Sequence, residues 1–209
     1  MRISELSGVA GVSVPTIKYY LREGLLPRGA PTARNQADYS RRHLQRLRLI
    51  RTLTEIGGLD LHAVRQVLQA IDDPRRSLHE VLGVAHHALG PTPSHQEPSE
   101  DVVAAQAEVD EFLAEHGWRV SQAAPARRAL ADALVALRRL GRNVGTEAFA
   151  PYAQAVYQLA AGEVGRVARA GPRDELVESL VVGTVVFEAV LTALRRLAQE
   201  HHSAIRLSP

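Results

Sequence analysis

The stretch from residue 13 to residue 28, SVPTIKYYLREGLLPR, constrains the fold of this chain more than any other. Ser13 is a suitable N-cap, because its hydroxyl can accept a hydrogen bond from the free backbone N–H groups of the next turn. Pro15 is tolerated just inside a helix start, where the N–H that it lacks would have no partner. The stretch therefore predicts a short amphipathic helix whose apolar residues recur at helical spacing, namely Val14, Ile17 and Leu21.

A second short helix is predicted directly before this one, at residues 3–10, and the two are joined through Gly11-Val12. Two short helices, a tight turn that contains glycine and a polar second helix describe a helix-turn-helix, whose second helix enters the major groove of DNA. The side chains expected on the outer side of the second helix are those of Thr16, Lys18, Tyr19 and Arg22. The pattern predicts a DNA-binding protein.

Charge is distributed unevenly along the chain. Residues 1–51 contain ten Lys or Arg and three Asp or Glu, a formal charge of +7. Residues 52–209 contain fifteen Lys or Arg and twenty Asp or Glu, a formal charge of −5. An excess of positive charge over a helix-turn-helix is typical of a surface that faces nucleic acid, and the alternative is a basic face that is merely solvated. We therefore expect the first part of the chain to bind DNA and the rest to have another role.

The order of these motifs resembles that of the MerR family of bacterial transcription regulators. The resemblance covers about residues 1–72 and rests on ISEL (3–6), GVSVPTIKYYLREGLLP (11–27), Tyr39-Ser40, RLRLIRTLTEIGGLDL (46–61) and VRQVL (64–68). It implies a winged helix-turn-helix and a homodimer that binds an inverted repeat of double-stranded promoter DNA and bends or untwists it. It also implies RNA polymerase and a small-molecule effector as further partners.

The wing of such a module corresponds to residues 28–38, where periodicity is too weak to define strands. Members of the family often carry Gly-Tyr-Arg before the Tyr-Ser pair, whereas this chain has NQAD at 35–38. Phosphate contacts position a protein without reading bases, and the first turn of the helix after Ser40 is also favourable for phosphate. An ordinary surface loop is the alternative for any one of these residues. The predicted DNA-binding residues are Ser13, Pro15, Thr16, Lys18, Tyr19, Arg22, Arg28, Arg34, Tyr39, Arg41 and Arg42.

The pattern predicts a mainly α fold, with an N-terminal winged helix-turn-helix domain followed by a C-terminal helical bundle. We expect the DNA-binding domain at 1–76, a short connecting helix and Pro-rich linker at 77–100, and an all-helical dimerisation and effector-binding domain at 101–209. The family usually has one long dimerisation helix after the DNA-binding module, but here the helix at 77–89 ends at Gly90-Pro91. The dimer could therefore form through the last helix or through the helix at 77–89.

Several classes of function are disfavoured by the residues present. The chain has no cysteine, so disulfides and thiolate metal sites are excluded. Its histidine pairs are adjacent in sequence and point about 100° apart on a helix, so we expect no metal site and no cofactor. Motifs for nucleophilic catalysis or nucleotide binding are also missing, so we do not expect an enzyme. Because Glu5 interrupts the N-terminal apolar stretch, we expect a cytoplasmic protein without a membrane segment.

Two carboxylates interrupt the most apolar stretch of the chain, at 176–197. In one interpretation they face solvent or pair with arginines, and the aromatic residues of this half belong to the core. In the other, a desolvated carboxylate meets a cationic, amphipathic ligand in a pocket lined by aromatic rings. The candidate ligand-binding residues are Trp118, Tyr152, Glu178, Phe187 and Glu188.

The sequence thus favours a homodimeric, sequence-specific transcription regulator that responds to a ligand. Two alternatives remain open, an architectural or recombination accessory protein and a DNA-anchored scaffold for protein interactions. Accessory proteins with this module are usually short, which the helical second half argues against. The sequence does not determine the operator, the regulon, the identity or existence of an effector, or whether transcription is activated or repressed.

Overall fold

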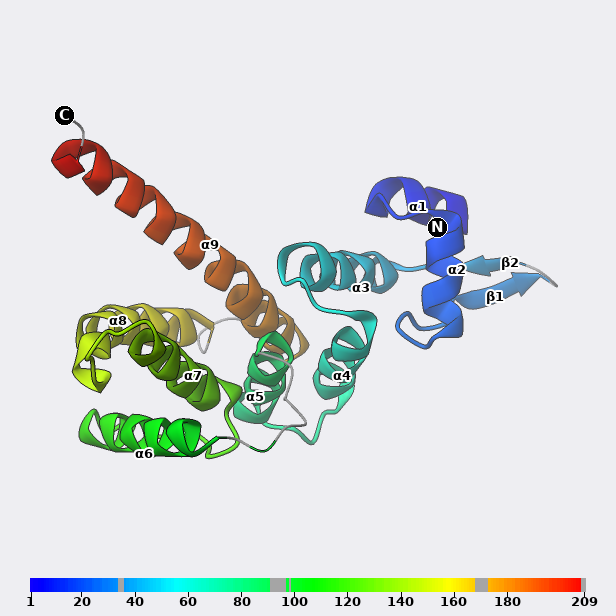
Figure 1. Cartoon of the computed structure of the whole chain (residues 1–209). Coiled ribbons are helices and arrows are strands. Elements are labelled where there is room, and N and C mark those ends of the chain that lie inside the picture. The colour runs from blue at the N-terminus through cyan, green and yellow to red at the C-terminus, as the bar shows by residue number, and fades with distance from the viewer. Residues whose placement is uncertain (34–35, 91–96, 98, 168–172, 208–209) are drawn as a thin grey trace.

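The computed structural model of the chain describes residues 1–33, 36–90, 97, 99–167 and 173–207 (Figure 1). Helices dominate this part of the chain, and its two strands form one antiparallel hairpin in which Ala30 pairs with Asp38 and Pro31 with Ala37. The elements are α1 (Ile3–Ala10), α2 (Val14–Arg22), β1 (Ala30–Ala33), β2 (Gln36–Asp38), α3 (Arg41–Arg51), η1 (Thr52–Ile56), α4 (Leu61–Asp72), α5 (Leu78–Leu89), α6 (Glu100–Glu115), α7 (Pro125–Arg139), η2 (Thr146–Phe149), α8 (Ala150–Val167) and α9 (Arg173–Leu207).

The first of three hydrophobic cores lies under the helix-turn-helix and the wing. Leu6 from α1, Ile17 from α2 and Leu47 from α3 are fully buried there. Tyr39, which follows β2, is 8% exposed and closes this core from the side of the wing. Ile17 is thus buried as predicted and Leu21 packs against the same core, whereas Val14 is only half-buried. The loop at 28–38 forms the strands that its periodicity did not define.

The basic helix that follows Ser40 is continuous to Ile56 but changes its winding. It is α-helical to Arg51 and then completes a π turn, η1, in which Leu53 remains fully buried. Leu47 packs in the first core, whereas Leu49, at 3% exposure, packs in the second. Helix α3 is therefore covered on two sides, because it contacts the first core and also the second core described next.

The second core joins the DNA-binding module to the far end of the sequence. Val64 and Val67 of α4 and Val81 of α5 pack in it together with Val177 and Val181 of α9, and all five are fully buried. One side of the last helix was expected to pack on a C-terminal bundle, but its main contacts are with α5 and η1, with fewer to α8 and α4. The last helix therefore belongs structurally to the module at the start of the chain.

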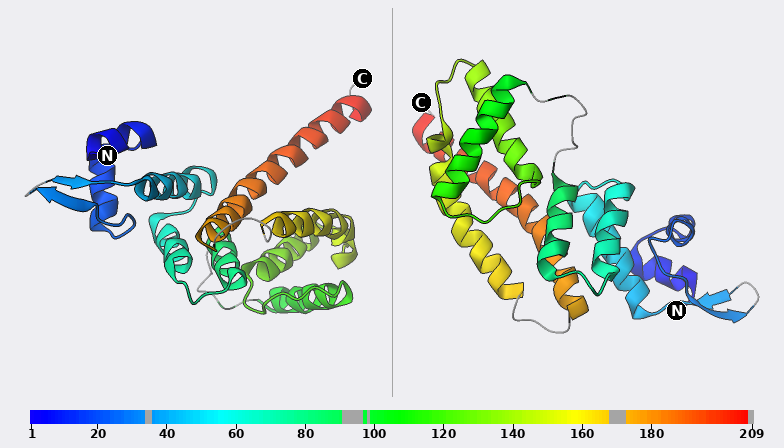
Figure 2. Two further views of the ribbon diagram at one scale, coloured as in Figure 1. Left: turned by 180° about the vertical axis from the view of Figure 1, so that it is seen from behind. Right: turned by 90° about the horizontal axis from the view of Figure 1, so that it is seen from below.

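The third core holds α6, α7 and the start of α8 together. Phe112 and Val109 of α6 and Leu134 of α7 are buried in it, and Ala153 is the residue of α8 that is buried there. The two additional views of Figure 2 show these three helices as a separate layer beside α5 and α9. Most of α8 beyond Ala153 is exposed, so the layer is joined to α9 by few buried side chains.

The second half of α9 projects from the molecule as a single rod (Figures 1 and 2). Leu194 is 58% exposed and Leu197 is 61% exposed, whereas Val185 in the first half is 2% exposed. By length and composition alone, residues 175–207 could cross a membrane, a test that the core helices of many other proteins also pass. The packing of the first half into the second core accounts for part of this apolar character.

Candidate nucleic-acid interface

Helix α2 begins as its sequence predicts. The Ser13 hydroxyl accepts a hydrogen bond from the Thr16 backbone N–H at 3.2 Å, and the two side-chain hydroxyls lie 2.7 Å apart. Pro15 lies in the first turn of the helix. Gly11, between α1 and α2, has a φ of +64°, and a Cβ at this position would lie 2.9 Å from the guanidinium of Arg51. The turn therefore requires glycine for its backbone conformation, and the guanidinium of Arg51 packs closely against it.

The outer face of α2 presents polar side chains to solvent. Lys18 and Arg22 are exposed, and Thr16 and Tyr19 are half-buried. The guanidinium of Arg22 lies over the ring of Tyr19, 5.4 Å from the ring centre. This contact orders two of the four predicted side chains relative to each other.

Two arginines of α3 hold the helix-turn-helix from behind. Arg51 donates to the carbonyl oxygen of Ala10 at 3.1 Å and pairs with Glu55 of η1 through two hydrogen bonds of 2.9 Å. Arg46 donates to the carbonyl oxygen of Leu25 at 3.1 Å and pairs with Asp72 at the end of α4. Arg51 thus fixes the turn before α2, and Arg46 fixes the loop after it.

A third ion pair holds the end of α2 itself. Arg65 of α4 donates to Glu23 at 3.1 Å. The sequence analysis did not single out Arg46 or Arg51, and these positioning roles were not predicted. The only signal was that the arginines of this helix spread over more than half of its circumference, so some of them had to face inward.

The wing and the start of α3 carry the remaining predicted residues. Arg28, Arg41 and Arg42 are exposed, and Arg34 lies outside the described residues. Tyr39 is mostly buried, with its ring 5.2 Å from that of His43 in an edge-on arrangement, so it contributes to the core, and its role in phosphate binding stays a prediction. The exposed arginines and Lys18 therefore form the accessible basic part of the predicted set.

The first turn of α3 is fixed by a histidine that the sequence did not single out. His43 accepts a hydrogen bond from the Ser40 backbone N–H through Nδ1 at 3.0 Å. Its Nε2 lies 3.4 Å from the carbonyl oxygen of Arg28. Because Nδ1 accepts, the ring proton is on Nε2 and can point to that carbonyl. His43 thus connects the wing to the helix that presents Arg41 and Arg42.

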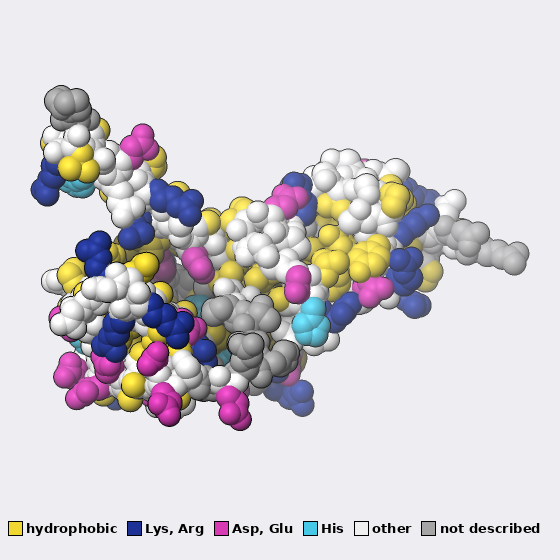
Figure 3. Space-filling model, in the orientation of Figure 1, with side chains coloured by type: hydrophobic (Ala, Val, Ile, Leu, Met, Phe, Trp, Pro, Cys, Tyr) yellow, Lys and Arg dark blue, Asp and Glu magenta, His cyan; other side chains and the backbone are white. Residues whose placement is uncertain are grey.

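Basic side chains gather at this end of the molecule. Figure 3 shows Lys and Arg at the end that carries α2 and the wing, while most Asp and Glu on this face lie over the helical layer at the other end, where they are mixed with further Lys and Arg. The charge asymmetry of the sequence is therefore also an asymmetry in space.

The candidate ligand residues do not line one common cavity. Phe187 and Glu188 line a groove of about 320 Å³ between α8 and α9, the α8–α9 groove, together with Leu82 and His86 of α5. Trp118 lies at the edge of the third core and stacks on Tyr157, with ring centres 6.2 Å apart. Tyr152 lines a separate hollow near the end of α9, where Arg195 lies 5.8 Å from its ring centre.

Glu178 occupies a third place, on the half-buried side of α9. Burial raises the pKa of this carboxyl, and the nearby positive charge of Arg46 opposes the increase. Since Arg46 supports the loop after α2, Glu178 lies next to the support of the DNA-binding helix and away from the α8–α9 groove.

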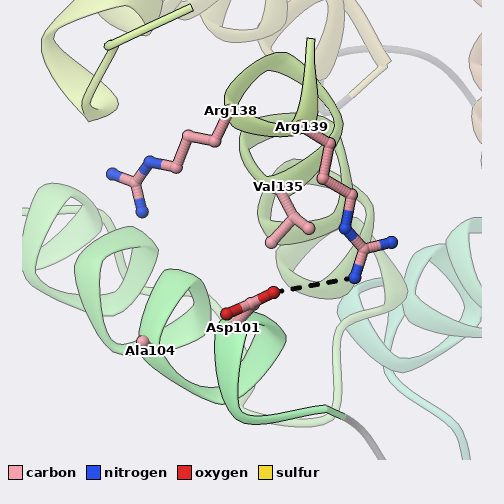
Figure 4. Close-up of a pocket in the computed structure, with 5 residues that line it drawn as sticks. All are labelled: Asp101, Ala104, Val135, Arg138 and Arg139. Atoms are coloured by element: carbon pink, nitrogen blue, oxygen red, sulfur yellow. Dashed lines mark ion pairs between the residues drawn. The ribbon is translucent and has the colours of Figure 1, made fainter. Parts of the chain in front are cut away.

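A further hollow, of about 310 Å³, lies between α6 and α7 (Figure 4). Its charged groups are already paired, because Asp101 forms an ion pair with Arg139 at 3.7 Å and Arg138 donates to Glu108 at 2.7 and 2.8 Å. The lining offers a ligand no free charge, so the α8–α9 groove is the better candidate. Among the described residues, no group of three or more His, Asp or Glu side chains is arranged to hold a metal ion.

Comparisons with known proteins agree with the geometry of the N-terminal module. The model of the MerR HTH family of regulatory proteins matches residues 1–71. The nodulation protein NolA of Bradyrhizobium sp. (strain NC92) is 37% identical over 81 residues, which are 39% of this chain and 32% of NolA. The mercuric resistance operon regulatory protein of Bacillus cereus is 35% identical over 71 residues, which are 34% of this chain and 53% of that protein. The chain thus spans between a third and about half of the length of these two relatives.

One solved structure is similar over nearly the whole length. The crystal structure of the transcriptional regulator SCO5550 from Streptomyces coelicolor A3(2) has a TM-score of 0.74 and 39% sequence identity, and the match covers 99% of this chain and 97% of that one. The similarity therefore includes α5 to α9 as well as the winged helix-turn-helix. With its N-terminal module matched by the family model and its full length matched by a regulator, this chain belongs to the MerR family of DNA-binding transcription regulators.

Proposed function

We propose that this regulator binds an inverted-repeat operator as a homodimer, reading each half-site with α2. The observation that carries the proposal is the contrast between the two sides of α2. Its outer side carries exposed Lys18 and Arg22, while Arg46, Arg51 and Arg65 hold its two ends from behind. A rigid helix with a free polar face is suited to reading base edges in the major groove.

The predicted contacts divide by role. Lys18 and Thr16, on the outer face of α2, are assigned to base edges or to the groove wall, with Tyr19 and Arg22 beside them. Ser13 and Pro15, at the start of α2, are assigned to contacts close to the DNA backbone. The residues assigned to phosphates of the flanking DNA are Arg28, Arg34, Tyr39, Arg41 and Arg42. Phosphate contacts of this kind set register and most of the affinity, whereas α2 sets the sequence preference.

Two α2 helices must be held at a fixed distance for an inverted repeat to be recognised. The exposed second half of α9 supports dimerisation through that helix rather than through α5, whose Val81 and Ala85 are already buried in the second core. In this arrangement residues 1–76 bind DNA, residues 77–100 connect, and residues 101–209 carry dimerisation and effector binding. Distortion of the promoter, at a cost of ~1–6 kcal/mol, would then control its use by RNA polymerase.

The α8–α9 groove is the proposed effector site. Its wall is mostly apolar, with Leu159 and Leu191 at 47% and 43% exposure, and its volume is near the lower end of sites for small organic ligands. Glu163 and Glu188 line it, and neither has a hydrogen bond or ion pair with another residue that the structure describes. Arg166 also lines the groove, with its guanidinium 5.9 Å from the centre of the Phe187 ring. A cationic, amphipathic molecule would supply the apolar surface and the positive charge that pairs with the two carboxylates.

Footprinting on the DNA upstream of the protein's own gene tests the DNA-binding part. We expect protection of an inverted repeat, and an affinity that falls steeply with salt, with a logarithmic slope of about −0.9 for each phosphate neutralised. Binding that does not change between low and physiological salt would contradict a phosphate-based interface, and binding without protection of two related half-sites would contradict the dimer.

Equilibrium dialysis with tetraphenylphosphonium, and with tetraphenylborate as the anion of matched shape, tests the effector site. We expect the cation to bind more tightly than the anion and Glu188→Gln to weaken that preference. Glu115→Gln, an exposed carboxylate at the end of α6 and outside the groove, is the control and should bind like wild type. Equal binding of both probes would exclude a role for the groove carboxylates.

A further inference from the structure

A separate hollow lies farther along α8 and α9, beyond the α8–α9 groove. The two helices diverge toward this end of the molecule (Figures 1 and 2). The hollow between them has a volume of about 490 Å³ and is lined by Tyr152 near the start of α8 and by residues of the second half of α9. We call it the Tyr152 hollow. Its volume lies within the range of sites that bind small organic molecules.

The two arginines of the Tyr152 hollow, Arg195 and Arg206, lie on the same side of α9. At about 100° per residue, their side chains are about 20° apart around the helix, and His202 lies about 20° from Arg195 in the other direction. The exposed apolar residues Val190 and Leu197 lie about 140° and 160° away from Arg195 on the same circle. A second copy that covered the apolar side of α9 would therefore leave the hollow open.

The positive charge of the hollow is not neutralised within the described part of the chain. Neither arginine has an ion pair with a described residue, and no Asp or Glu lines the hollow. The acidic residue nearest in sequence, Glu200, lies about 140° around the helix from Arg195. A guanidinium binds a carboxylate or phosphate group through two parallel N–H donors. An oxyanion is therefore the partner that these arginines select.

The ring of Tyr152 orders Arg195 for such a partner. The guanidinium lies over this ring, 5.8 Å from its centre, and Tyr152 is 56% exposed. Stacking of this kind limits the conformations of the guanidinium and leaves the N–H groups at its edge able to donate. Gln199, one turn farther along α9, adds an amide donor, and Ala198 adds apolar surface. The hollow thus combines an ordered positive charge with an aromatic wall.

The Tyr152 hollow and the α8–α9 groove are adjacent but differ in charge. Tyr152 precedes the groove residue Val156 by about one turn of α8, and Arg195 follows the groove residue Leu191 by about one turn of α9. The groove contains two carboxylates and one guanidinium, whereas the described lining of the hollow contains two guanidinium groups and no carboxylate. A negatively charged ligand is therefore favoured in the hollow over the groove.

We propose that the Tyr152 hollow is a second ligand site, which binds an amphipathic oxyanion: a small molecule with an aromatic or aliphatic body and one carboxylate or phosphate group. Arg195 and Gln199 hold the oxyanion, and Arg206 adds positive charge. The body of the ligand packs against Tyr152 and Ala198. The site is additional to the proposed effector site and does not depend on it, because no residue lines both.

Equilibrium dialysis of the intact chain with naphthoate, naphthyl phosphate and the uncharged naphthamide tests the site, because the three probes have the same apolar body. We expect at least one of the two oxyanions to bind about tenfold or more tightly than the amide, and the tighter one identifies the head group as carboxylate or phosphate. Equal binding of all three probes would overturn the proposal. Tetraphenylborate does not test this site, because its charge is surrounded by four rings and offers no oxygen acceptor.

Variants of single arginines locate the bound oxyanion. Arg195→Gln should bind the preferred oxyanion about tenfold more weakly than wild type and should bind naphthamide unchanged. Arg196→Gln is the matched control, because it makes the same change of charge one residue farther on, outside the hollow. It should bind like wild type. An equal loss in both variants would reduce the effect to net charge and overturn the proposal. A loss in Arg166→Gln instead would place the anion in the α8–α9 groove, with the same consequence.

The aromatic wall is tested by two changes of one residue. Tyr152→Ala should weaken the binding of every naphthalene probe, whereas Tyr152→Phe should not, because the ring and not the hydroxyl forms the wall. Both variants should have the circular dichroism of wild type, since Tyr152 is largely exposed. Unchanged binding by Tyr152→Ala would contradict the site. A chain that binds the cationic probe in the groove but no oxyanion refutes the second site alone and leaves the proposed function intact.

Discussion

Arg46 and Asp72 form a two-pronged ion pair that closes the DNA-binding module, and the same guanidinium donates to the carbonyl oxygen of Leu25. The pair joins the basic helix α3 to the end of α4, and the carbonyl belongs to the loop that ends α2. A basic residue that seems suited to phosphate contact is thus used inside the protein, and its side chain is only 14% exposed.

Replacing Arg46 should therefore reduce stability as well as DNA binding. Arg46→Ala leaves the buried Leu25 carbonyl and the Asp72 carboxylate without their donor, a loss of about 1–3 kcal/mol in the free energy of unfolding. Arg48→Ala is the control, because Arg48 is exposed on the same helix. Thermal unfolding of both variants measures the difference. Equal stability of the two would mean that Arg46 does not support the loop after α2.

Lys18 and Arg41 should differ in how they contribute to DNA binding. Lys18→Ala should weaken binding to the operator by ~1–3 kcal/mol if the side chain reaches a base edge, with a smaller effect on unrelated DNA. Arg41→Ala should weaken binding to all sequences about equally, because a phosphate contact carries no sequence information. Competition binding with operator and unrelated duplexes measures both. If both folded variants bind operator like wild type, the orientation of α2 assumed here is wrong.

The role of α9 in the dimer can be tested by shortening the chain. Ending it near Gly90 would remove Val177, Val181 and Val185 from the second core, so that loss of dimer and loss of folding could not be separated. Ending the chain after Ala189 keeps these three valines and removes the exposed second half of α9, which includes Leu194 and Leu197. We expect this variant to be folded by circular dichroism, monomeric at micromolar concentration by sedimentation, and a poor binder of full operator. A stable dimer would instead indicate that α5 or the helical layer holds the two copies together.

Glu178 should make stability depend on pH. Burial raises the pKa of its carboxyl in the folded state above the value in the unfolded chain. The folded state therefore binds the proton more tightly, and the stability that this provides is complete below the unfolded pKa and is lost as pH rises through the folded pKa. We expect Glu178→Gln to unfold at a higher temperature than wild type near pH 7, with the difference shrinking toward acid pH.

Glu115→Gln is the control for that measurement, because Glu115 is an exposed carboxylate at the end of α6. It should show little difference from wild type at either pH. An unchanged melting temperature of Glu178→Gln at pH 7 would mean that attraction to Arg46 balances the cost of burial.

The helix-turn-helix could be predicted from sequence because its determinants are local. The cap at Ser13, the turn at Gly11 and the apolar spacing around Ile17 act over a few residues, and each is found as expected. The wing was expected only from the family resemblance. Its strands alternate weakly in hydrophobicity, and their pairing depends on contacts between residues 30–33 and 36–38 that no periodicity records.

The sequence by itself determined that this is a mainly α protein with a basic DNA-reading helix at one end, because helix caps, periodicity and charge are properties of neighbouring residues. Only the tertiary structure decided which arginines of α3 are used as internal supports and which side of α9 is left open. Both depend on partners far away in sequence. Arg46 pairs with Asp72, and Val177 and Val181 pack against buried residues of α4 and α5. An arginine on a helix has the same local pattern whether it faces a phosphate or a carbonyl, so packing alone distinguishes the two.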